Sequence, residues 1–404
     1  MSTTRKRTVK IDMQATVKSL QERLSCAVVC LSHSWGGLEQ VAAADALELG
    51  KQGLKVKVVC LEGSPIHLHL ARRDELTVHP LTFRPRDTFD FKLRGEIHRW
   101  ISENGVNLIH THQTTLLGSI SPWLWNHRNV ALVATRHIMN SHDKRNLFHS
   151  LIYRRVDCLV VMSQVLRDNV LQTHRLRERQ VKVIHLGIDL DAFDPEKIDA
   201  SAQRAEWGAD DGTVVIGLVG RIDPAKGQET FIKAAAGLLK NPGKHKGKFK
   251  FVIVGEETLG SELEYTQELQ KIVEQFRIQD HVVFAGYKEN IPEVMSAFDI
   301  FVMPSRQEAF GLVAIEAMAM ECPIVISRGG SASEIVGDED YGLLIRPDDA
   351  FDLQRQIRYL LDHPRERTQM GKQGRQHIRK SYDRRVRLLR TLTLYERMLR
   401  LRGI

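Results

Sequence analysis

The sequence predicts an α/β protein with two doubly wound domains, each a parallel sheet covered by helices on both faces. Short β-branched runs alternate with helical stretches, and this alternation restarts after a polar stretch at about 194–212. Alternation of this kind is typical of parallel sheets, whose connections are helical. The length of 404 residues also fits two domains, at roughly 100–200 residues per domain.

Each domain is expected from its own series of strands and helices. The strands expected in the first half are 24–31, 54–61, 78–83, 106–112, 130–135, 158–162 and 181–184, and the helices are 38–53, 91–104, 147–155 and 164–174. The strands expected in the second half are 214–219, 249–254, 282–284, 300–303, 324–327 and 343–345. Helices are expected there at 227–239, 260–276, 291–297, 312–320, 331–336 and 351–361. We place the first domain at 1–200 and the second at 201–383. Because ligands of doubly wound domains bind at the carboxyl ends of the strands, two such domains facing one another would form an interdomain cleft.

Composition excludes several classes of protein. The chain is 42% hydrophobic and 27% charged, which is typical of a globular protein and not of a disordered one. No apolar run approaches the ~18–20 residues of a membrane-spanning helix. The basic first ten residues lack a following apolar region, so we expect no secretory signal. The five cysteines are scattered, and we expect them to be buried thiols in a reducing cytosol.

The net charge of +8 is concentrated at the two ends of the chain. Residues 375–402 carry +8 and residues 1–23 carry +4, which leaves −4 for the part between them. Docking on an anionic membrane, worth about 1 kcal/mol per basic residue, is one interpretation. A solvated helix face is the other, and we rank the two equally. Nucleic acid binding ranks well behind, because no nucleic-acid motif accompanies the charges.

Several short motifs follow strands in the first domain. Gly36 and Gly37 form a turn between a strand and a helix. Such a turn lets backbone N–H groups approach an anion, but it also occurs where no ligand binds. The turn is not GxGxxG, so NAD is disfavoured. His112 ends the strand that carries His110, and the two imidazoles share a face. One of this pair is expected to be structural and the other to face a ligand.

Two further candidates in the first half carry less weight. His137 follows Arg136 at the end of the next strand, the position that corresponds to that of His112 on its own strand. Asp189 and Asp191 form a DxD that could bind a metal, but aspartate is a normal loop residue and we favour that interpretation. No third and fourth metal ligands can be named beside the HxH.

Two segments of the second domain suggest a diphosphate site. Arg221 and Lys226 lie in a loop that opens a helix, where two cations and a helix N-terminus suit a diphosphate. Taken alone, this segment is explained equally well by two surface cations on a loop. The segment 304–319 follows the apolar strand 300–303. It carries Glu308 in a loop and Gly311 at a helix start, with Glu316 about 7.5 Å further along that helix at ~1.5 Å per residue. Two carboxylates therefore flank one anion cradle, as a sugar, a diphosphate and a ribose would require.

These motifs resemble those of the retaining GT-B glycosyltransferases, specifically of family 4. The pair Glu308 and Glu316, with Phe310, Gly311 and Leu312 between them, resembles the E-x7-E motif of that family. The resemblance extends over about 24–380, and its other matching segments are Gly36-Gly37, Leu108–His112, Gly187–Asp189, Gly220-Arg221 with Lys226-Gly227, and Gly329–Ser331 with Glu334. One departure is the segment Gly255-Glu256-Glu257, where many relatives have a second glycine.

The resemblance implies a GT-B fold and a retaining transfer of a hexose from a nucleotide-diphosphate sugar. Arg221, Lys226 and the backbone near Gly311 and Leu312 would hold the diphosphate, Glu308 the sugar hydroxyls and Glu316 the ribose. His112 would contact the sugar and orient the reacting centre, and Gly36 and Gly37 would complete the donor site. No cofactor or metal is expected. The last helix, 384–404, would pack back on the first domain, with its arginines on the outside.

The acceptor is expected to be a cell-envelope glycan or a lipid-linked glycan, met by the first domain. We expect Arg136 and His137, together with loops 65–73 and 140–145, to contribute to its binding. The enzyme is expected in the cytoplasm, with an anionic membrane surface as a further partner and no nucleic acid. The alternatives are a GT-B sugar-nucleotide epimerase or phosphorylase, or a non-catalytic regulator that binds sugar nucleotides. The base, the sugar, the linkage and the oligomeric state stay open.

Overall fold

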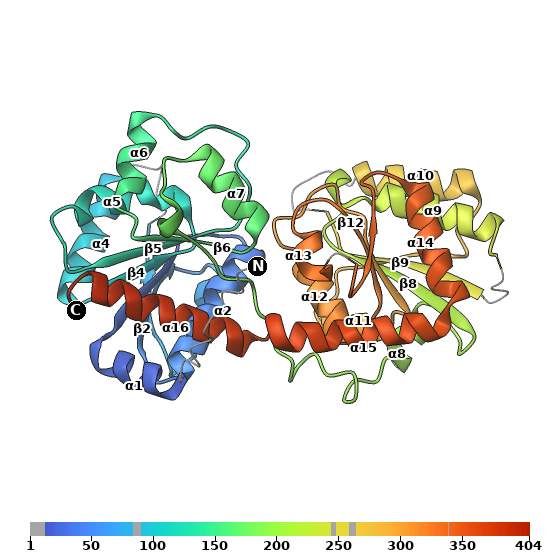
Figure 1. The fold of residues 1–404 in the computed structure, drawn as a ribbon, viewed down its shortest axis with the longest axis horizontal. Helices are drawn as coiled ribbons and strands as arrows, with labels where there is room; N and C mark the ends of the chain where they lie inside the picture. The colour runs from blue at the N-terminus through green and yellow to red at the C-terminus, as the bar shows by residue number, and fades with distance from the viewer. Residues whose placement is uncertain (1–12, 84–89, 244–247, 258–263, 338) are drawn as a thin grey trace, which may run out of the picture. The chain divides into compact units, whose positions relative to one another are not determined.

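The computed structural model describes residues 13–83, 90–243, 248–257, 264–337 and 339–404. Within these ranges the chain divides into two compact units. The first unit comprises 1–162, 166–184 and 387–404, and the second comprises 163–165 and 185–386. Both are α/β units with parallel sheets (Figure 1). The basic residues expected at the extreme N-terminus, Arg5, Lys6, Arg7 and Lys10, lie outside the described residues.

The first unit is built on a seven-stranded parallel sheet with the order β3-β2-β1-β4-β5-β6-β7. Its strands are β1 (Ser25–Cys30), β2 (Lys55–Leu61), β3 (Thr77–Leu81), β4 (Leu108–Thr111), β5 (Ala131–Arg136), β6 (Cys158–Val161) and β7 (Val181–Val183). Its helices are α1 (Met13–Arg23), α2 (Gly37–Lys51), α3 (Pro65–Leu70), α4 (Phe91–Glu103), α5 (Leu117–Leu124), α6 (Leu147–Arg154) and α7 (Gln164–Thr173), with 3-10 turns η1 (Thr114–Leu116) and η2 (Glu178–Gln180). The strand order reverses between β1 and β4, which makes the carboxyl ends of these two strands the expected ligand position.

The second unit is built on a six-stranded parallel sheet with the order β10-β9-β8-β11-β12-β13. Its strands are β8 (Thr213–Val219), β9 (Lys248–Val254), β10 (Val282–Gly286), β11 (Ile300–Met303), β12 (Ile324–Ser327) and β13 (Leu343–Ile345). Its helices are α8 (Ser201–Glu206), α9 (Gln228–Lys240), α10 (Glu264–Phe276), α11 (Ile291–Ser296), α12 (Leu312–Ala319), α13 (Ala332–Val336), α14 (Ala350–Asp362) and α15 (Pro364–Ser381), with the 3-10 turn η3 (Pro224–Lys226). Here the order reverses between β8 and β11.

The last helix, α16 (Arg384–Leu401), packs on the first unit (Figure 1). Leu392, Tyr395 and Leu399 of this helix lie in the same buried cluster as Cys26 and Val28 of β1. One expectation about this helix is wrong, because its arginines do not all face outward. Arg387 is only 8% exposed, since it forms an ion pair with a carboxylate of α2.

The units divide at His185 and not at residue 201. Residues 185–200 belong to the second unit because they pair with its last segment. Ile188 forms a parallel bridge with Asp383, Arg384 forms an ion pair with Asp189, and Arg375 donates to the carbonyl of Phe193. These bonds join residues nearly two hundred positions apart, so no local pattern could have placed the boundary.

The structure also bears on two smaller expectations, one of which is wrong and one of which is confirmed. The segment 65–73, expected to be a loop, is mostly the helix α3, whose N-terminus is capped by the Ser64 hydroxyl, which accepts from His67 N. All five cysteines are buried free thiols, as expected. No helix of the described residues is both long and apolar enough to cross a bilayer.

Candidate active site

The second unit brings the loops that follow β8 and β11 into contact. Gly227 ends η3 in the left-handed region with φ +79°, and a Cβ on it would lie 2.4 Å from the carbonyl oxygen of Pro304. Only glycine allows both the backbone conformation and this close approach. The amide of Arg306 also donates to the carbonyl of Ala225 over 2.9 Å. The two loops at the switch point of the sheet are therefore fixed to one another.

This contact pairs two of the predicted site residues. The Nζ atom of Lys226 lies 2.6 Å from Oε1 of Glu308, and their side chains are 29% and 15% exposed. A partly desolvated, charge-assisted hydrogen bond of this kind is stronger than a neutral one. Arg221, from the same loop as Lys226, is 56% exposed and pairs with Asp223 over 2.7 Å. Its guanidinium therefore stands at the surface of the loop, while Lys226 lies beside the carboxylate.

The loop that carries Glu308 is held by a tight turn from beyond β12. A Cβ on Gly330 would lie 1.8 Å from the carbonyl oxygen of Glu308, so the two backbones touch. Ser331 N donates to that same carbonyl, and Ser331 Oγ donates to the carbonyl of Phe310. Phe310 is itself buried, which anchors the loop from the inside. These backbone contacts fix the loop on which Glu308 lies.

The N-terminus of α12 follows directly. Gly311 caps it in the left-handed region with φ +83°, and Leu312 is its first residue. The first N–H groups of a helix have no partner within the helix and carry a partial positive charge, so they can bind an anion. Burial raises the pKa of Glu316, one turn along this helix, to about 7. Its carboxyl group is therefore far more easily protonated than an exposed glutamate.

The segment that departs from the family pattern has a structural explanation here. Gly255 has φ +137°, and a Cβ on it would lie 2.0 Å from the carbonyl oxygen of Gly220. The single glycine thus already allows β9 to pass close to the loop after β8. Glu256 Oε1 accepts from Tyr287 N, and Glu257 Oε1 accepts from the amide and hydroxyl of Thr266. Both carboxylates therefore tie neighbouring segments of the second unit together.

The first unit gathers three histidines at the carboxyl ends of β4 and β5. His110 is structural, because its Nδ1 pairs with the hydroxyl of Tyr395 and its Nε2 with Oγ1 of Thr135, both at 2.7 Å. His112 Nδ1 lies 3.3 Å from Nε2 of His137. His112 is 1% exposed, and its Nε2 makes no hydrogen bond to any described residue. A buried polar atom left without a partner costs about 1–3 kcal/mol.

A buried ion pair that the sequence did not predict lies beside these histidines. Arg387 of α16 donates to both carboxylate oxygens of Asp45 in α2, over 2.7 and 2.5 Å. Asp45 Oδ2 is also 3.8 Å from Nε2 of His112, which is longer than a hydrogen bond. A local signal existed, because Asp45 interrupts the apolar face of a helix.

Burial keeps this cluster of histidines neutral. It lowers the pKa of His110 to about 4 and that of His137 to about 3, and the nearby charge of Arg387 acts in the same direction on both. The pKa of His112 is also lowered well below its ordinary value by burial and by the two neighbouring imidazoles. Neutral imidazoles can donate or accept a hydrogen bond but carry no charge to a ligand.

The remaining predicted residues have other partners. Arg136 is buried and donates to the carbonyl of Ile138 and to the side chains of Thr114 and Asn140. Its guanidinium is therefore engaged within the fold. Gly36 and Gly37 are exposed at the start of α2, and Gly36 N already donates to Oε2 of Glu39 over 2.9 Å.

Both aspartates of the DxD form ion pairs with arginines of α16. Asp189 pairs with Arg384 over 2.5 Å, and Asp191 pairs with Arg385 over 3.0 Å. No group of three potential metal-ligating side chains occurs in the part of the chain that the structure describes.

Comparison with known families matches both units. Residues 35–192 match the family model described as "Glycosyltransferase Family 4", and residues 199–377 match that of "Glycosyl transferases group 1". A D-inositol 3-phosphate glycosyltransferase of Mycobacteroides abscessus is 29% identical over 344 residues, which are 77% of this chain and 73% of the relative. A lipopolysaccharide core biosynthesis mannosyltransferase, LpsB of Rhizobium meliloti, is 30% identical over 66% of this chain and 72% of its own length.

Solved structures show the same fold. A glycosyltransferase of Rickettsia africae superposes with a TM-score of 0.81 at 18% identity, over 93% of this chain and 98% of that one. Anabaena HepE, solved in complex with UDP, gives 0.80 at 21% identity, over 92% of this chain and 100% of its own. With its two parallel-sheet units, the chain therefore has the GT-B fold and belongs to the group 1 glycosyltransferases.

Proposed function

We propose that this glycosyltransferase moves a hexose from a nucleotide-diphosphate sugar to a hydroxyl of a cell-envelope glycan or lipid-linked acceptor, with retention at the anomeric carbon. The observation that carries the proposal is the contact of Lys226 with Glu308 at the switch point of the second sheet. A cation, a carboxylate and the N-terminus of α12 there offer partners for a diphosphate and for sugar hydroxyls.

The charges of the second unit suggest how a donor would be held. A diphosphate bound at the N-terminus of α12 would attract Lys226 and Arg221 and stabilise the charge that develops on the leaving group. Lys226 would then share its N–H groups between the phosphate and Glu308, whose second oxygen is left to accept from sugar hydroxyls. No metal is required in this scheme, because the cations and the helix N-terminus supply the positive charge.

Glu316 and Gly311 would place the rest of the nucleotide. Glu316 is the one carboxylate on α12, and as an anion it could accept hydrogen bonds from both ribose hydroxyls. Because its pKa is raised to about 7, ribose hydroxyls that hydrogen-bond to the ionised form would lower it again on binding. Donor binding should therefore strengthen as the pH rises through 7.

In the first unit, His112 is the residue we assign to the sugar. Its Nε2 has no hydrogen bond to any described residue, and it follows the strand at the switch point of the first sheet. A sugar hydroxyl would give this atom a partner and would orient the reacting centre. The backbone of Gly37 and the imidazole of His137 are assigned to the same half of the site. Arg136 would support the acceptor only indirectly, because its guanidinium is engaged.

The names of relatives suggest which donors and acceptors to try first. The solved Anabaena protein is described with UDP-glucose, and the Rhizobium relative is named as a mannosyltransferase of the lipopolysaccharide core. The Mycobacteroides relative is named for inositol 3-phosphate. These names favour UDP-glucose or a mannose-bearing sugar nucleotide as donor, and hydroxyl-rich acceptors that carry phosphate or lipid.

The test is a thermal-shift panel of UDP-glucose, GDP-mannose and ADP-glucose followed by turnover. A donor at 100 times its Kd stabilises the native state by about 2.7 kcal/mol. We expect one donor to raise Tm, and the rise to shrink in Lys226→Ala and Glu316→Gln. Glu274→Gln, an exposed carboxylate of α10, is the matched control and should keep the full shift. The anomeric configuration of the product, read by NMR, tests retention.

The same experiment separates the alternatives. Binding of a donor without turnover on any acceptor would favour a regulator over an enzyme. Formation of a different sugar nucleotide, or of a sugar phosphate, would instead identify an epimerase or a phosphorylase. A folded protein that none of the three donors stabilises would contradict the proposed donor site.

A further inference from the structure

The first unit carries an arginine-lined hollow away from the histidine cluster. The hollow has a volume of about 680 Å³. Its walls come from the end of α6, from the loop before β7 and from the last turns of α16. The basic residues that line it are Arg154, Arg175, Arg177, Arg179, Arg397 and Arg402. Asp157 is the one carboxylate among the lining residues, which leaves a formal excess of five positive charges.

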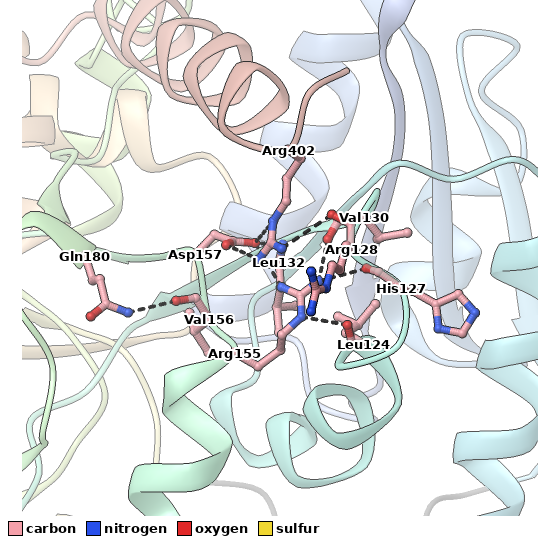
Figure 2. Close-up of polar contacts among 10 residues, drawn as sticks. All are labelled: Leu124, His127, Arg128, Val130, Leu132, Arg155, Val156, Asp157, Gln180 and Arg402. Atoms are coloured by element: carbon pink, nitrogen blue, oxygen red, sulfur yellow. Dashed lines mark hydrogen bonds and ion pairs between the residues drawn. The ribbon is translucent and has the colours of Figure 1, made fainter.

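The single carboxylate of the hollow is already fully engaged. Asp157 accepts from the guanidinium of Arg155 over 3.0 Å, from Leu132 N over 2.8 Å and from the guanidinium of Arg402 (Figure 2). The other five lining arginines form no ion pair with any described carboxylate. Glu178, which lies between two of them in sequence, pairs instead with Arg167. The positive charge of these five arginines is therefore not offset by any described carboxylate, and an anion among them would be attracted.

The walls of the hollow are held by hydrogen bonds. Arg155 is buried and donates to the carbonyls of Leu124, His127 and Val130, as Figure 2 shows. Gln180 Nε2 donates to the carbonyl of Val156 over 3.0 Å. Its Oε1 accepts from the amide of Arg177 over 3.2 Å, which fixes the arginine-bearing loop. An anion would therefore meet a preformed site, and little ordering of the backbone would oppose binding.

The hollow is distinct from the proposed catalytic half-site of the same unit. Asp157 immediately precedes β6 and Gln180 immediately precedes β7, so the hollow lies at the amino ends of the strands. His112 follows the carboxyl end of β4. In a parallel sheet these are opposite edges, separated by at least a strand of four residues, or about 13 Å. The donor and the acceptor of the transfer reaction do not explain the hollow.

An apolar groove adjoins the hollow. It has a volume of about 330 Å³ and runs between the edge strand β7 and α16. Its aliphatic lining residues are Val183, Ile184, Leu389 and Leu394. Arg397 lines both the groove and the hollow, so the two share a wall. A ligand with a phosphate group and an alkyl chain would fill both.

We infer that the arginine-lined hollow is a binding site for a phosphate group, separate from the site of glycosyl transfer. Arginine suits this ligand because its planar guanidinium donates two parallel hydrogen bonds to phosphate oxygens. The phosphate can belong to a free phosphorylated molecule or to the headgroup of an anionic lipid, and the adjoining groove offers a place for the chain of the lipid.

The first arm of the test measures phosphate alone. Inorganic pyrophosphate is titrated by calorimetry into the full chain carrying Lys226→Ala, which weakens the competing donor site equally in both variants compared below. The variant Arg175→Gln, Arg177→Gln, Arg179→Gln is compared with the charge-matched control Arg365→Gln, Lys372→Gln, Arg379→Gln on α15. All six side chains are exposed, so both variants should keep the fold, which circular dichroism checks. We expect the hollow variant to bind at least about tenfold more weakly than the control.

The second arm separates the two sources of phosphate. Flotation is measured with vesicles of phosphatidylcholine alone and with vesicles of equal parts phosphatidylcholine and phosphatidylglycerol. Loss of flotation on the mixed vesicles in the hollow variant, but not in the control, assigns the site to a lipid headgroup. Weaker pyrophosphate binding with equal flotation of both variants assigns it to a free phosphorylated ligand.

The inference fails on either of two results. One is the absence of measurable pyrophosphate binding to the folded Lys226→Ala chain together with no preference for the mixed vesicles. The other is equal weakening in the hollow variant and the control, which would show that only net charge matters. Arg397→Gln, on the α16 wall, provides a single-site check that leaves the loop before β7 intact.

Discussion

The two units repeat one architecture but place opposite chemistry at their switch points. The first unit has neutral imidazoles around a buried ion pair, Asp45 with Arg387. The second has a partly exposed pair, Lys226 with Glu308, beside a helix N-terminus and the carboxyl of Glu316. Both units use the same edge of a parallel sheet, so the difference comes from the loop and helix residues and not from the strands.

Burial favours the neutral form of the titratable groups at both sites, but the resulting dependence of stability on pH has opposite signs. Desolvation favours the neutral form of any titratable group, so it lowers the pKa of a buried histidine and raises that of a buried glutamate. Acid therefore destabilises the first unit by charging its histidines. A rise in pH destabilises the second unit because it ionises the carboxyl group of Glu316.

The largest expected effect comes from breaking the ion pair of the first unit. Asp45→Ala leaves Arg387 buried without its counter-ion, which should cost about 3–5 kcal/mol. Four of the five tryptophans, Trp35, Trp100, Trp123 and Trp125, lie in the first unit, so urea unfolding followed by tryptophan fluorescence reports mainly on it. Asp143→Ala, an exposed carboxylate of the same unit, is the control and should cost less than about 1 kcal/mol. Equal costs would contradict the special role of the buried pair.

The next largest effect is a difference in acid stability between the two units. The pKa of His110 is about 4 when folded against an ordinary value of 6.5, so the unfolded chain binds the proton more tightly. The stability that this neutral histidine contributes above pH 6.5 is lost as the pH falls toward 4, by about 2 kcal/mol between pH 6.5 and 5. His137 acts in the same direction. Hydrogen exchange should show β4 and β5 losing protection before β8 and β11, after correction for the intrinsic rate. Loss of protection in the opposite order would show that these histidines are not neutral when folded.

Glu316 should give a smaller effect of the opposite sign. Because its folded pKa of about 7 lies above its ordinary 4.5, the folded protein binds the proton more tightly. The stability that the protonated carboxyl of Glu316 contributes is present below pH 4.5 and is lost as the pH rises through 7. The loss amounts to about 1–2 kcal/mol after allowance for partial exposure of the side chain. Glu316→Gln should therefore raise Tm relative to the wild type at pH 8 but not at pH 5. A variant less stable than the wild type at both pH values would show that the carboxylate has a structural partner.

Much of this fold could be predicted because most of its strands are buried on both faces. Continuous β-branched and apolar runs marked all seven strands of the first sheet and all six of the second, with ends displaced by a few residues. The candidate donor residues were also predictable, because Lys226, Glu308 and Gly311 lie in loops directly after strands. Those loops meet for a reason visible in the sequence, namely the glycines that allow close backbone approach.

The contacts between distant segments could not be predicted. Asp45 and Arg387 are 342 positions apart, and no local pattern connects them. The place of Arg136 inside a hydrogen-bond network, and the contact of Gly36 with Glu39, depend on how side chains turn and not on spacing. The arginine hollow likewise combines a loop before β7 with the end of α16. The charge count revealed the basic C-terminal segment, but it did not show that Arg154, Arg175, Arg177 and Arg179 line one hollow with it.

The smallest expected effect concerns the DxD. Asp191 pairs with Arg385 where both side chains are about two-thirds exposed, so the ion pair is screened by water and salt. Asp191→Asn should change the free energy of unfolding by less than about 1 kcal/mol and leave glycosyl transfer unchanged. Transfer should also survive EDTA, because the proposed donor site uses Lys226, Arg221 and the N-terminus of α12 for charge. A contrary result would be that EDTA abolishes transfer and that Mg²⁺ restores it in the wild type but not in Asp191→Asn. The DxD would then bind a metal, and the ion pairs of Asp189 and Asp191 would have to open to admit it.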